Sequence, residues 1–269
     1  MTNSAQPEPR VLVLIPAHDE APRIAAVVRG AAAHLPVLVV DDGSSDDTAS
    51  VAREAGAEVL EQRPNAGKGA ALRAGFRHAL AAGYDGVITL DGDGQHDPAE
   101  IPLFLAAFGV LGEAGDGRQP RVDEPGVVDP PDSGSTVGAP AWAARPDLVV
   151  GRRDFSRMPP ARRLANTVGG QAFSWAVGSR VPDNQSGYRL VARRLMEASL
   201  QSTEHGFEFE VEILATSIAR GWPVAWVPIR TIYTGGPSHI RPAAHVRHFF
   251  RAVAAARRTV REARREPRA

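Results

Sequence analysis

The chain has 269 residues, which is enough to bury a sizeable core in one large domain. Its 31 Lys and Arg residues balance 31 Asp and Glu residues, so no overall charge favours nucleic acid, and we expect no nucleic-acid partner. Cysteine is absent, which excludes disulfides, thiolate metal ligands and a cysteine nucleophile, and is typical of a reducing compartment.

The beginning of the chain lacks the apolar run that a secretory signal needs, and we expect residues 1–10 to be disordered. No stretch approaches the roughly 20 apolar residues that span a bilayer. These features predict a cytoplasmic location, with peripheral contact to the inner face of a membrane as the open alternative.

Short apolar runs alternate with Ala-rich segments in the first part of the chain. The apolar runs predict buried strands at residues 11–15, 37–41, 57–62 and 86–90, with a later one at 148–150. The Ala-rich segments predict helices at residues 21–33, 47–55 and 67–82. This alternation indicates an α/β fold with a mostly parallel central sheet and helices on both faces. Ligands of such sheets bind at the carboxyl ends of the strands.

Residues 109–146 interrupt this pattern, because they are rich in Gly, Pro and Asp and lack apolar periodicity. We interpret them as a disordered insertion, with a substrate lid as the alternative. Beyond them the sequence predicts a helix at 160–177, a polar turn at 182–187, a helix at 207–219 and a strand at 224–229. One domain therefore occupies residues 11–242, followed by a basic helix or tail at 243–269.

The strongest chemical signal is the turn Asp91, Gly92, Asp93, Gly94 and Gln95, which directly follows the strand predicted at 86–90. It places two carboxylates at the ligand edge of the sheet, and hard oxygen ligands of this kind suit Mg²⁺ or Mn²⁺. The alternative is a solvated acidic turn, which is common for Asp and Gly.

Polar residues also follow the earlier strands. Asp42 ends the apolar run VLVVDD and can accept hydrogen bonds from a base or ribose, while Glu20 opens the first helix, where an acid is also favoured by the helix dipole. The segment NAGKG, which contains Lys68, resembles a phosphate-binding loop at a helix N-terminus. It lacks the earlier Gly and the Ser or Thr of a triphosphate-binding P-loop.

Together these segments resemble the family 2 glycosyltransferases of the A-type fold, and most closely their dolichol-phosphate mannosyltransferase group. The resemblance extends from about residue 11 to 242, apart from the insertion. The segments that carry it, in the family's order, are IPAHDE, VVDDGSSDDT, NAGKGAALRAGF, DGDGQHDP, VVGRR, DNQSGYR, HGFEFEVEIL and SHIRP.

The resemblance implies a nucleotide-sugar donor site built from several loops. Its contacts to the nucleotide and diphosphate would come from Pro16, Ala17, Glu20, Asp42, Lys68, Asp91, Gly92 and His239. The metal would be held by Asp91, Asp93 and Gln95. His239 stands where close relatives often have Lys, and histidine is charged only partly at neutral pH.

The resemblance also implies an acceptor side. Arg152 or Arg153 after a strand and Arg163 in the next helix would hold the acceptor phosphate, for which guanidinium geometry is suited. The remaining acceptor-side residues would be Asp183, Ser186 and Arg189. Glu208 and Glu210 are further catalytic candidates, although positions i and i+2 point to different faces of a helix.

These assignments imply an inverting transfer of a hexose, mannose or glucose, from a GDP- or UDP-sugar to a polyprenyl or dolichyl monophosphate. The phosphate oxygen of such an acceptor is already anionic, so it needs no strong general base, and the metal would stabilise the leaving diphosphate. If the acceptor is instead a hydroxyl group, a carboxylate such as Asp183 must take its proton. A phosphoacceptor receiver-like signalling domain is the alternative of another class, because VLVVDD and a later strand-end Asp imitate its acidic pocket.

Two apolar patterns complete the predictions. In the basic tail the residues at helical spacing are Val246, Phe249, Phe250 and Val253, which predicts a helix that either contacts anionic membrane or packs on the domain. The tryptophans expected in the core are Trp175, Trp222 and Trp226.

Overall fold

The computed structural model describes residues 9–109, 145–155, 158, 160–230, 232, 253–254, 256–258 and 260–261. The predictions of a disordered N-terminus and of a disordered insertion concern residues that lie almost wholly outside these ranges. His239 and most of the basic tail lie outside them as well.

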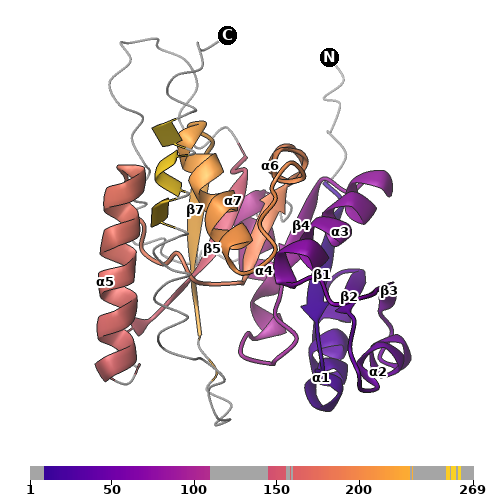
Figure 1. Ribbon diagram of the computed structural model, residues 1–269. Helices are drawn as coiled ribbons and strands as arrows, with labels where there is room; N and C mark the ends of the chain where they lie inside the picture. Colours follow the sequence, from indigo (N-terminus) through magenta and orange to yellow (C-terminus); the bar gives the residue numbers. More distant parts are fainter. Residues whose placement is uncertain are drawn as a thin grey trace, which may run out of the picture.

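A seven-stranded sheet forms the centre of the described chain, in the order β3-β2-β1-β4-β6-β5-β7 (Figure 1). The strands are β1 Val11–Ala17, β2 Val37–Asp42, β3 Glu58–Gln62, β4 Gly86–Thr89, β5 Leu148–Arg153, β6 Arg189–Ala192 and β7 Val224–Ile229. Strands β1 to β4 pair in parallel, as do β5 and β7. Only β6 of this sheet runs antiparallel, to β4 and to β5. The predicted mostly parallel sheet is therefore confirmed.

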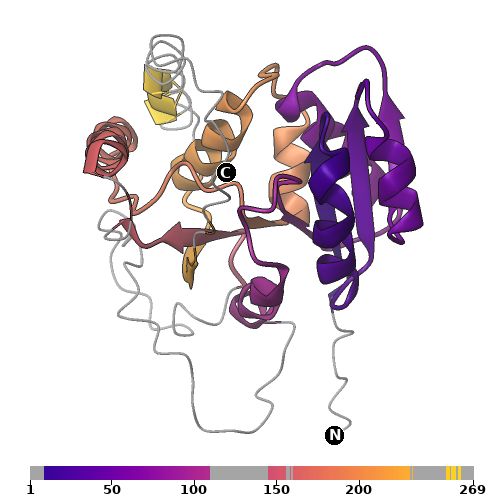
Figure 2. The same cartoon turned by 90° about the horizontal axis from the view of Figure 1, so that it is seen from below.

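Helices cover both faces of the sheet, as expected (Figure 2). The helices are α1 Ala21–Ala32, α2 Thr48–Glu54, α3 Lys68–Ala81, α4 Ile101–Phe108, α5 Pro160–Val177, α6 Arg193–Ser199 and α7 Glu208–Ala219, with a 3₁₀ turn, η1, at Pro98–Glu100. One core cluster contains side chains of α3, α5, α6 and α7, and the other contains those of α1, α2 and α4.

The alternation of side chains along β1 explains why one strand serves both clusters. Leu12 and Leu14 belong to the α3 side of the sheet, whereas Val11, Val13 and Ile15 belong to the α1 side. Successive side chains of a strand point to opposite faces, so a continuous apolar run is needed where both faces are covered.

Three elements differ from the sequence-based expectations. The short strand β6 and the helices α4 and α6 were not predicted, because four to eight residues give little periodicity to detect. The expectation that Trp175 lies in the core is wrong, since this side chain is 68% exposed on α5. Trp222 and Trp226 are partly buried against the core, as expected.

The described part of the C-terminal tail packs on the domain. Ala256 and Val260 are buried, and Val253 packs against the same core cluster as α5 and α7. This arrangement supports the packing alternative for that part of the apolar stripe. In the described residues, no helix is both long and apolar enough to cross a membrane.

Candidate active site

The loop after β1 lies beside the turn after β4, because the two strands are neighbours. Glu20 precedes α1, donates its main-chain N–H to Thr48 Oγ1 at 2.8 Å, and its carboxylate accepts from Arg23 at 2.6 Å. Gly92 is buried, and it lies close to Glu20, because a Cβ at this position would be 3.5 Å from Glu20 Cγ. The structure thus brings one group of predicted donor-site residues to a single edge of the sheet: Pro16, Ala17, Glu20 and Gly92.

Asp42 shapes the loop that precedes α3. Its carboxylate is 4% exposed and accepts hydrogen bonds from Gln62 Nε2 at 2.9 Å, from Ala66 N at 2.8 Å and from Gly67 N at 2.7 Å. The main-chain N–H groups of Ala66 and Gly67 are the ones that a phosphate-binding loop would offer to a ligand. Because Asp42 already occupies them, the geometry favours a loop-forming role for Asp42 and weakens the phosphate-loop interpretation of NAGKG.

Lys68 lies between two carboxylates from different parts of the chain. Its Nζ atom is 2.6 Å from Asp91 Oδ1 and 3.0 Å from Glu210 Oε2. Burial alone would lower the pKa of the Lys68 ammonium, but Asp91 and Glu210 raise it above its ordinary value. Burial alone would likewise raise the pKa of the Asp91 carboxyl, but Lys68 and His96 hold it well below its usual range. This ion cluster joins the turn after β4 to α7.

The second carboxylate of the turn has a different environment. Asp93 is partly exposed, and its two oxygens accept from Gln95 N at 3.0 Å and from Gln95 Nε2 at 2.6 Å. Asp93 thus accepts hydrogen bonds from neutral groups, whereas Asp91 forms an ion pair with the Lys68 ammonium. Gly94 turns the chain between Asp93 and Gln95 at a φ of 73°, a conformation that favours glycine.

The residues of this turn fit a hard divalent cation. Nowhere in the described ranges do three or more His, Asp or Glu side chains form a metal-binding cluster, so the turn itself offers at most a pair of carboxylates. Mg²⁺ commonly binds one or two carboxylates and takes its remaining ligands from water and substrate phosphates. Asp93 is the better placed ligand of the two, because Asp91 is already paired with Lys68.

Two residues that sequence analysis did not assign surround Asp91. His96 is 8% exposed, and its Nε2 atom is 3.5 Å from Asp91 Oδ2, while its ring packs 5.2 Å from that of Tyr188. Gly187 approaches Asp91 so closely that a Cβ would lie 2.7 Å from Asp91 Oδ2. His96 lies within the quoted segment DGDGQHDP, which was the available signal for it.

Asp183 and Arg153 form a bidentate ion pair. Arg153 Nε donates to Asp183 Oδ2 at 2.7 Å, and Arg153 Nη2 donates to Asp183 Oδ1 at 2.9 Å. The main-chain N–H of Gln185 also donates to Asp183 Oδ1, at 3.0 Å. Asp183 is 2% exposed. A carboxylate held in this way is poorly placed to take a proton from an acceptor.

Arg189 supports the same segment from within the core. It is 1% exposed, and its guanidinium donates to the main-chain carbonyls of Asn184 and Ser186, at 3.2 and 2.7 Å, and to that of Glu210. The implied acceptor-side role of Arg189 is therefore indirect. Arg189 holds the segment that carries Asp183 at one end and Gly187 at the other.

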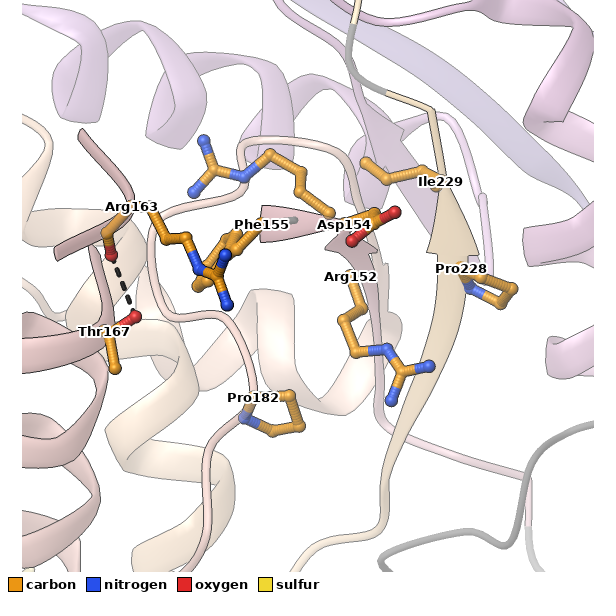
Figure 3. A pocket seen from close by; sticks show the side chains of 9 residues that line it. Arg152, Asp154, Phe155, Arg163, Thr167, Pro182, Pro228 and Ile229 are labelled. Carbon is orange, nitrogen blue, oxygen red and sulfur yellow. Dashed lines mark hydrogen bonds between the residues drawn. The ribbon is translucent and has the colours of Figure 1, made fainter. Parts of the chain in front are cut away.

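Arg153 of the Arg153–Asp183 ion pair also lines a pocket of about 370 Å³. Figure 3 shows the side chains around this pocket. Three arginines and one acid contribute to its lining, with residues of β5, α5 and β7: Arg152, Arg153, Asp154, Phe155, Arg163, Thr167, Pro182, Pro228 and Ile229. Thr167 Oγ1 donates to the carbonyl of Arg163 at 2.8 Å, one turn earlier in α5. The structure thus brings Arg152, Arg153 and Arg163 to one pocket, although they come from two elements.

The two halves of the predicted site are connected by contacts. Asp91, Lys68 and Glu210 form one ion cluster, and Arg153, which is paired with Asp183, lines the pocket with Arg163. Between them, Gly187 lies against Asp91, and Arg189 donates to the carbonyl of Glu210. Glu208 is buried as well, next to Gly206. Ser186 is buried, so its hydroxyl does not reach the surface. The remaining predicted residue, His239, lies outside the described ranges.

Comparison with known families decides what kind of protein this site serves. The model of "Glycosyl transferase family 2" matches residues 12–163, which is more than half of the chain. The chain belongs to this family. It is therefore a glycosyltransferase, and the alternative of a receiver-like signalling domain is excluded.

Characterised relatives of this glycosyltransferase include two bacterial mannosyltransferases. The polyprenol monophosphomannose synthase of Mycolicibacterium smegmatis is 29% identical over 242 residues, which cover 84% of this chain and 78% of the relative. The undecaprenyl-phosphate mannosyltransferase of Micrococcus luteus is 29% identical over 238 residues, which cover 82% of each chain. These similarities support a mannosyltransferase-like enzyme.

Solved structures confirm the A-type glycosyltransferase fold. Glucosyl-3-phosphoglycerate synthase from Mycobacterium tuberculosis, in complex with phosphoglyceric acid, superposes with a TM-score of 0.62 and 21% identity, and the match covers 94% of this chain and 80% of that one. The same synthase has been crystallised with Mn²⁺, UDP-glucose and phosphoglyceric acid, and with Mg²⁺ and UDP. At this identity the likeness concerns the fold alone.

Proposed function

We propose that this glycosyltransferase moves a hexose, mannose or glucose, from a GDP- or UDP-sugar to a polyprenyl monophosphate, with inversion at the anomeric carbon and with Mg²⁺ or Mn²⁺. The observation that carries the acceptor assignment is the pocket lined by Arg152, Arg153 and Arg163 at the carboxyl end of β5. Arginine is suited to bind a phosphate through two parallel hydrogen bonds, and each such charged contact contributes about 1.5 to 3 kcal/mol.

The state of Asp183 favours a phosphate acceptor over a hydroxyl acceptor. A hydroxyl nucleophile needs a general base, for which Asp183 was the candidate. Both Asp183 oxygens accept from the Arg153 guanidinium, and the carboxylate is buried. A phosphate monoester is anionic at neutral pH, so its oxygen can attack the anomeric carbon as the nucleoside diphosphate leaves, without proton transfer to Asp183.

The donor would lie at the strand edge formed by β1, β2 and β4. Asp93 and Gln95 would hold the metal there, and the chemistry that it supplies is stabilisation of the negative charge on the departing diphosphate. In this arrangement Lys68 keeps Asp91 ionised and fixed rather than reaching the donor phosphate itself, because its Nζ already binds Asp91 and Glu210.

The relatives support the donor and acceptor classes to different degrees. The names of the two mannosyltransferases include a polyprenyl phosphate, which agrees with the arginine pocket. Glucosyl-3-phosphoglycerate synthase has been crystallised with UDP-glucose and phosphoglyceric acid, but at 19% identity that likeness concerns the fold alone. GDP-mannose and UDP-glucose are therefore both kept as donor candidates.

The decisive experiment offers the protein labelled GDP-mannose and UDP-glucose in Mg²⁺ or Mn²⁺. Each donor is combined with a polyprenyl monophosphate, the corresponding polyprenol or phosphoglycerate. We expect a radiolabelled lipid product from one donor and no labelled phosphoglycerate. Transfer to phosphoglycerate alone, or to a lipid alcohol as well as to the lipid phosphate, would contradict the proposed acceptor.

A polyprenyl acceptor also implies contact with a membrane, and we propose that the protein binds peripherally at the cytoplasmic face. The basic tail contributes exposed charge, since Arg258 and Arg261 face solvent while Ala256 and Val260 face the core. Each Arg near an anionic surface contributes roughly 1 kcal/mol, so several would hold the protein reversibly.

A further inference from the structure

The outer face of α5 exposes apolar side chains to solvent. Val168 is 56% exposed and Trp175 is 68% exposed, and both are prominent among the large apolar residues that the described chain leaves exposed. They are seven residues apart in one helix, a spacing that places them on the same face about 10 Å from each other along the axis. α5 lies at one side of the molecule, away from β3 (Figure 1).

Positive charge accompanies this apolar face. The guanidinium of Arg257 lies 4.2 Å from the centre of the Trp175 ring, and Arg163 and Arg180, in and just after α5, are exposed. The sequence of α5 contains no Asp or Glu. The described C-terminal segment, with Arg257, runs beside α5 in both views of the fold (Figures 1 and 2).

The apolar face and the arginine pocket lie on the same helix. Arg163 and Thr167 line the pocket, and Val168 directly follows Thr167 in α5, about a quarter turn further around the helix. A phosphate in the pocket would therefore lie to one side of the apolar face, on the same element. Interfacial helices combine Arg on the polar side with Trp and aliphatic residues that enter the boundary between headgroups and acyl chains.

We propose that the α5 face formed by Val168 and Trp175, together with Arg257, rests on an anionic phospholipid bilayer and presents the arginine pocket to its surface. The acceptor assignment rests on the proposed function, but binding to the bilayer is testable without an acceptor. In this orientation the polyprenyl chain stays among the acyl chains while its phosphate enters the pocket. Contact with the bilayer would explain why Val168 and Trp175 are exposed instead of being buried in the protein core.

The first test measures binding to vesicles of phosphatidylcholine with phosphatidylglycerol, free of polyprenyl phosphate. The variant Val168→Ser/Trp175→Ala should lose about tenfold or more in partitioning to these vesicles relative to the wild type, because it removes the exposed apolar anchor. The matched control is Leu60→Ser, which removes an exposed apolar residue from β3 at the opposite edge of the sheet and should bind like the wild type. Unchanged thermal unfolding of all three proteins confirms that they are folded.

The second test separates this inference from the proposed function. With a short-chain, water-soluble prenyl phosphate the double variant should retain wild-type turnover, and with a long-chain acceptor in vesicles its turnover should fall. If the wild type uses neither acceptor, the proposed function fails, and the vesicle-binding assay still decides the role of α5. Equal binding of the double variant and the wild type to anionic vesicles would overturn the inference. Wild-type dimers that the substitutions dissociate, with unchanged vesicle binding, would assign the face to a second copy of the chain instead.

Discussion

Replacing Lys68 with Met tests the ion cluster that joins the turn after β4 to α7. Methionine keeps most of the volume and flexibility of lysine but removes the ammonium. Asp91 and Glu210, which Lys68 now bridges at 2.6 and 3.0 Å, would then lose the ammonium that lies between them. Glu210 is 7% exposed, and its Oε1 atom has no hydrogen-bond partner among the residues that the structure describes.

The expected cost follows from the burial of these groups. Removing one partner of a buried ion pair typically costs 3 to 5 kcal/mol, because an uncompensated charge remains. The Lys68 and Asp91 side chains are 30% and 28% exposed, so this ion pair is only partly buried. We therefore expect a loss of stability at the lower end of the range for buried pairs. A loss of about 3 kcal/mol reduces the equilibrium constant for folding roughly 10²-fold.

Urea unfolding of Lys68→Met measures this loss, and Lys68→Met/Glu210→Gln is the matched control. Neutralising Glu210 as well should restore about 1 to 2 kcal/mol, since neighbouring charges couple by amounts of this size. A loss below about 0.5 kcal/mol in the single variant would refute the reasoning, because that is the range of surface substitutions without a structural role.

The same variant has a predicted pH dependence. In the wild type the pKa of Asp91 is lowered on folding, so its contribution to stability is present above the unfolded pKa and is lost only as the pH falls through the folded one. Without Lys68, burial is opposed by the contacts of His96 alone, so the pKa of Asp91 should rise from its depressed value. The penalty in Lys68→Met should therefore shrink as the pH is lowered from 7 to below about 4, the usual range of a carboxyl pKa. A penalty that is constant over this range would contradict the assignment.

Three further substitutions separate the roles within the site. Asp93→Asn should lower turnover about 10²-fold or more, because the metal loses a ligand, with little change in the free energy of unfolding. Turnover equal to that of the wild type at every metal concentration would contradict this role. Arg163→Ala should raise the KM for a polyprenyl phosphate about 10- to 100-fold and spare donor binding, and calorimetry showing lost nucleotide-sugar binding would reverse the assignment. Gly187→Ala should lower kcat, because its Cβ would lie 2.7 Å from Asp91 Oδ2, and an unchanged kcat would show that this segment can shift away.

Local patterns in the sequence were sufficient to predict much of the sheet. The apolar runs of β1 and β2 are buried on both faces, so continuous Val, Leu and Ile residues marked them without ambiguity. The turn Asp91–Gln95 follows such a run, and its position at the strand end follows from the fold alone. The positions of these candidates were therefore predictable, although their partners were not.

The partners depend on contacts between segments far apart in the chain. Nothing near Asp42 in the sequence indicates that it binds the main chain of Ala66 and Gly67. The bridge from Lys68 to Glu210 spans 142 positions of the chain, and the exposure of Trp175 depends on where α5 lies relative to α7. An apolar residue at helical spacing is compatible with the core and with the surface, so periodicity alone gave the wrong prediction for Trp175.

In the proposed arrangement, the segment from Asp183 to Arg189 would hold the donor and the acceptor in fixed positions relative to each other. Asp183 fixes Arg153 at the pocket, and Gly187 packs against Asp91 at the turn after β4. Arg189 binds the carbonyls between them and one in α7, and β6 then pairs with both β4 and β5. The antiparallel strand β6, which the sequence did not predict, therefore joins the strand before the Asp91 turn to the strand that ends at the arginine pocket. Arg189 is buried and Gly187 is packed against Asp91. We therefore expect a shift of Asp183 or of Asp91 to move this segment, and with it the residue at the other end.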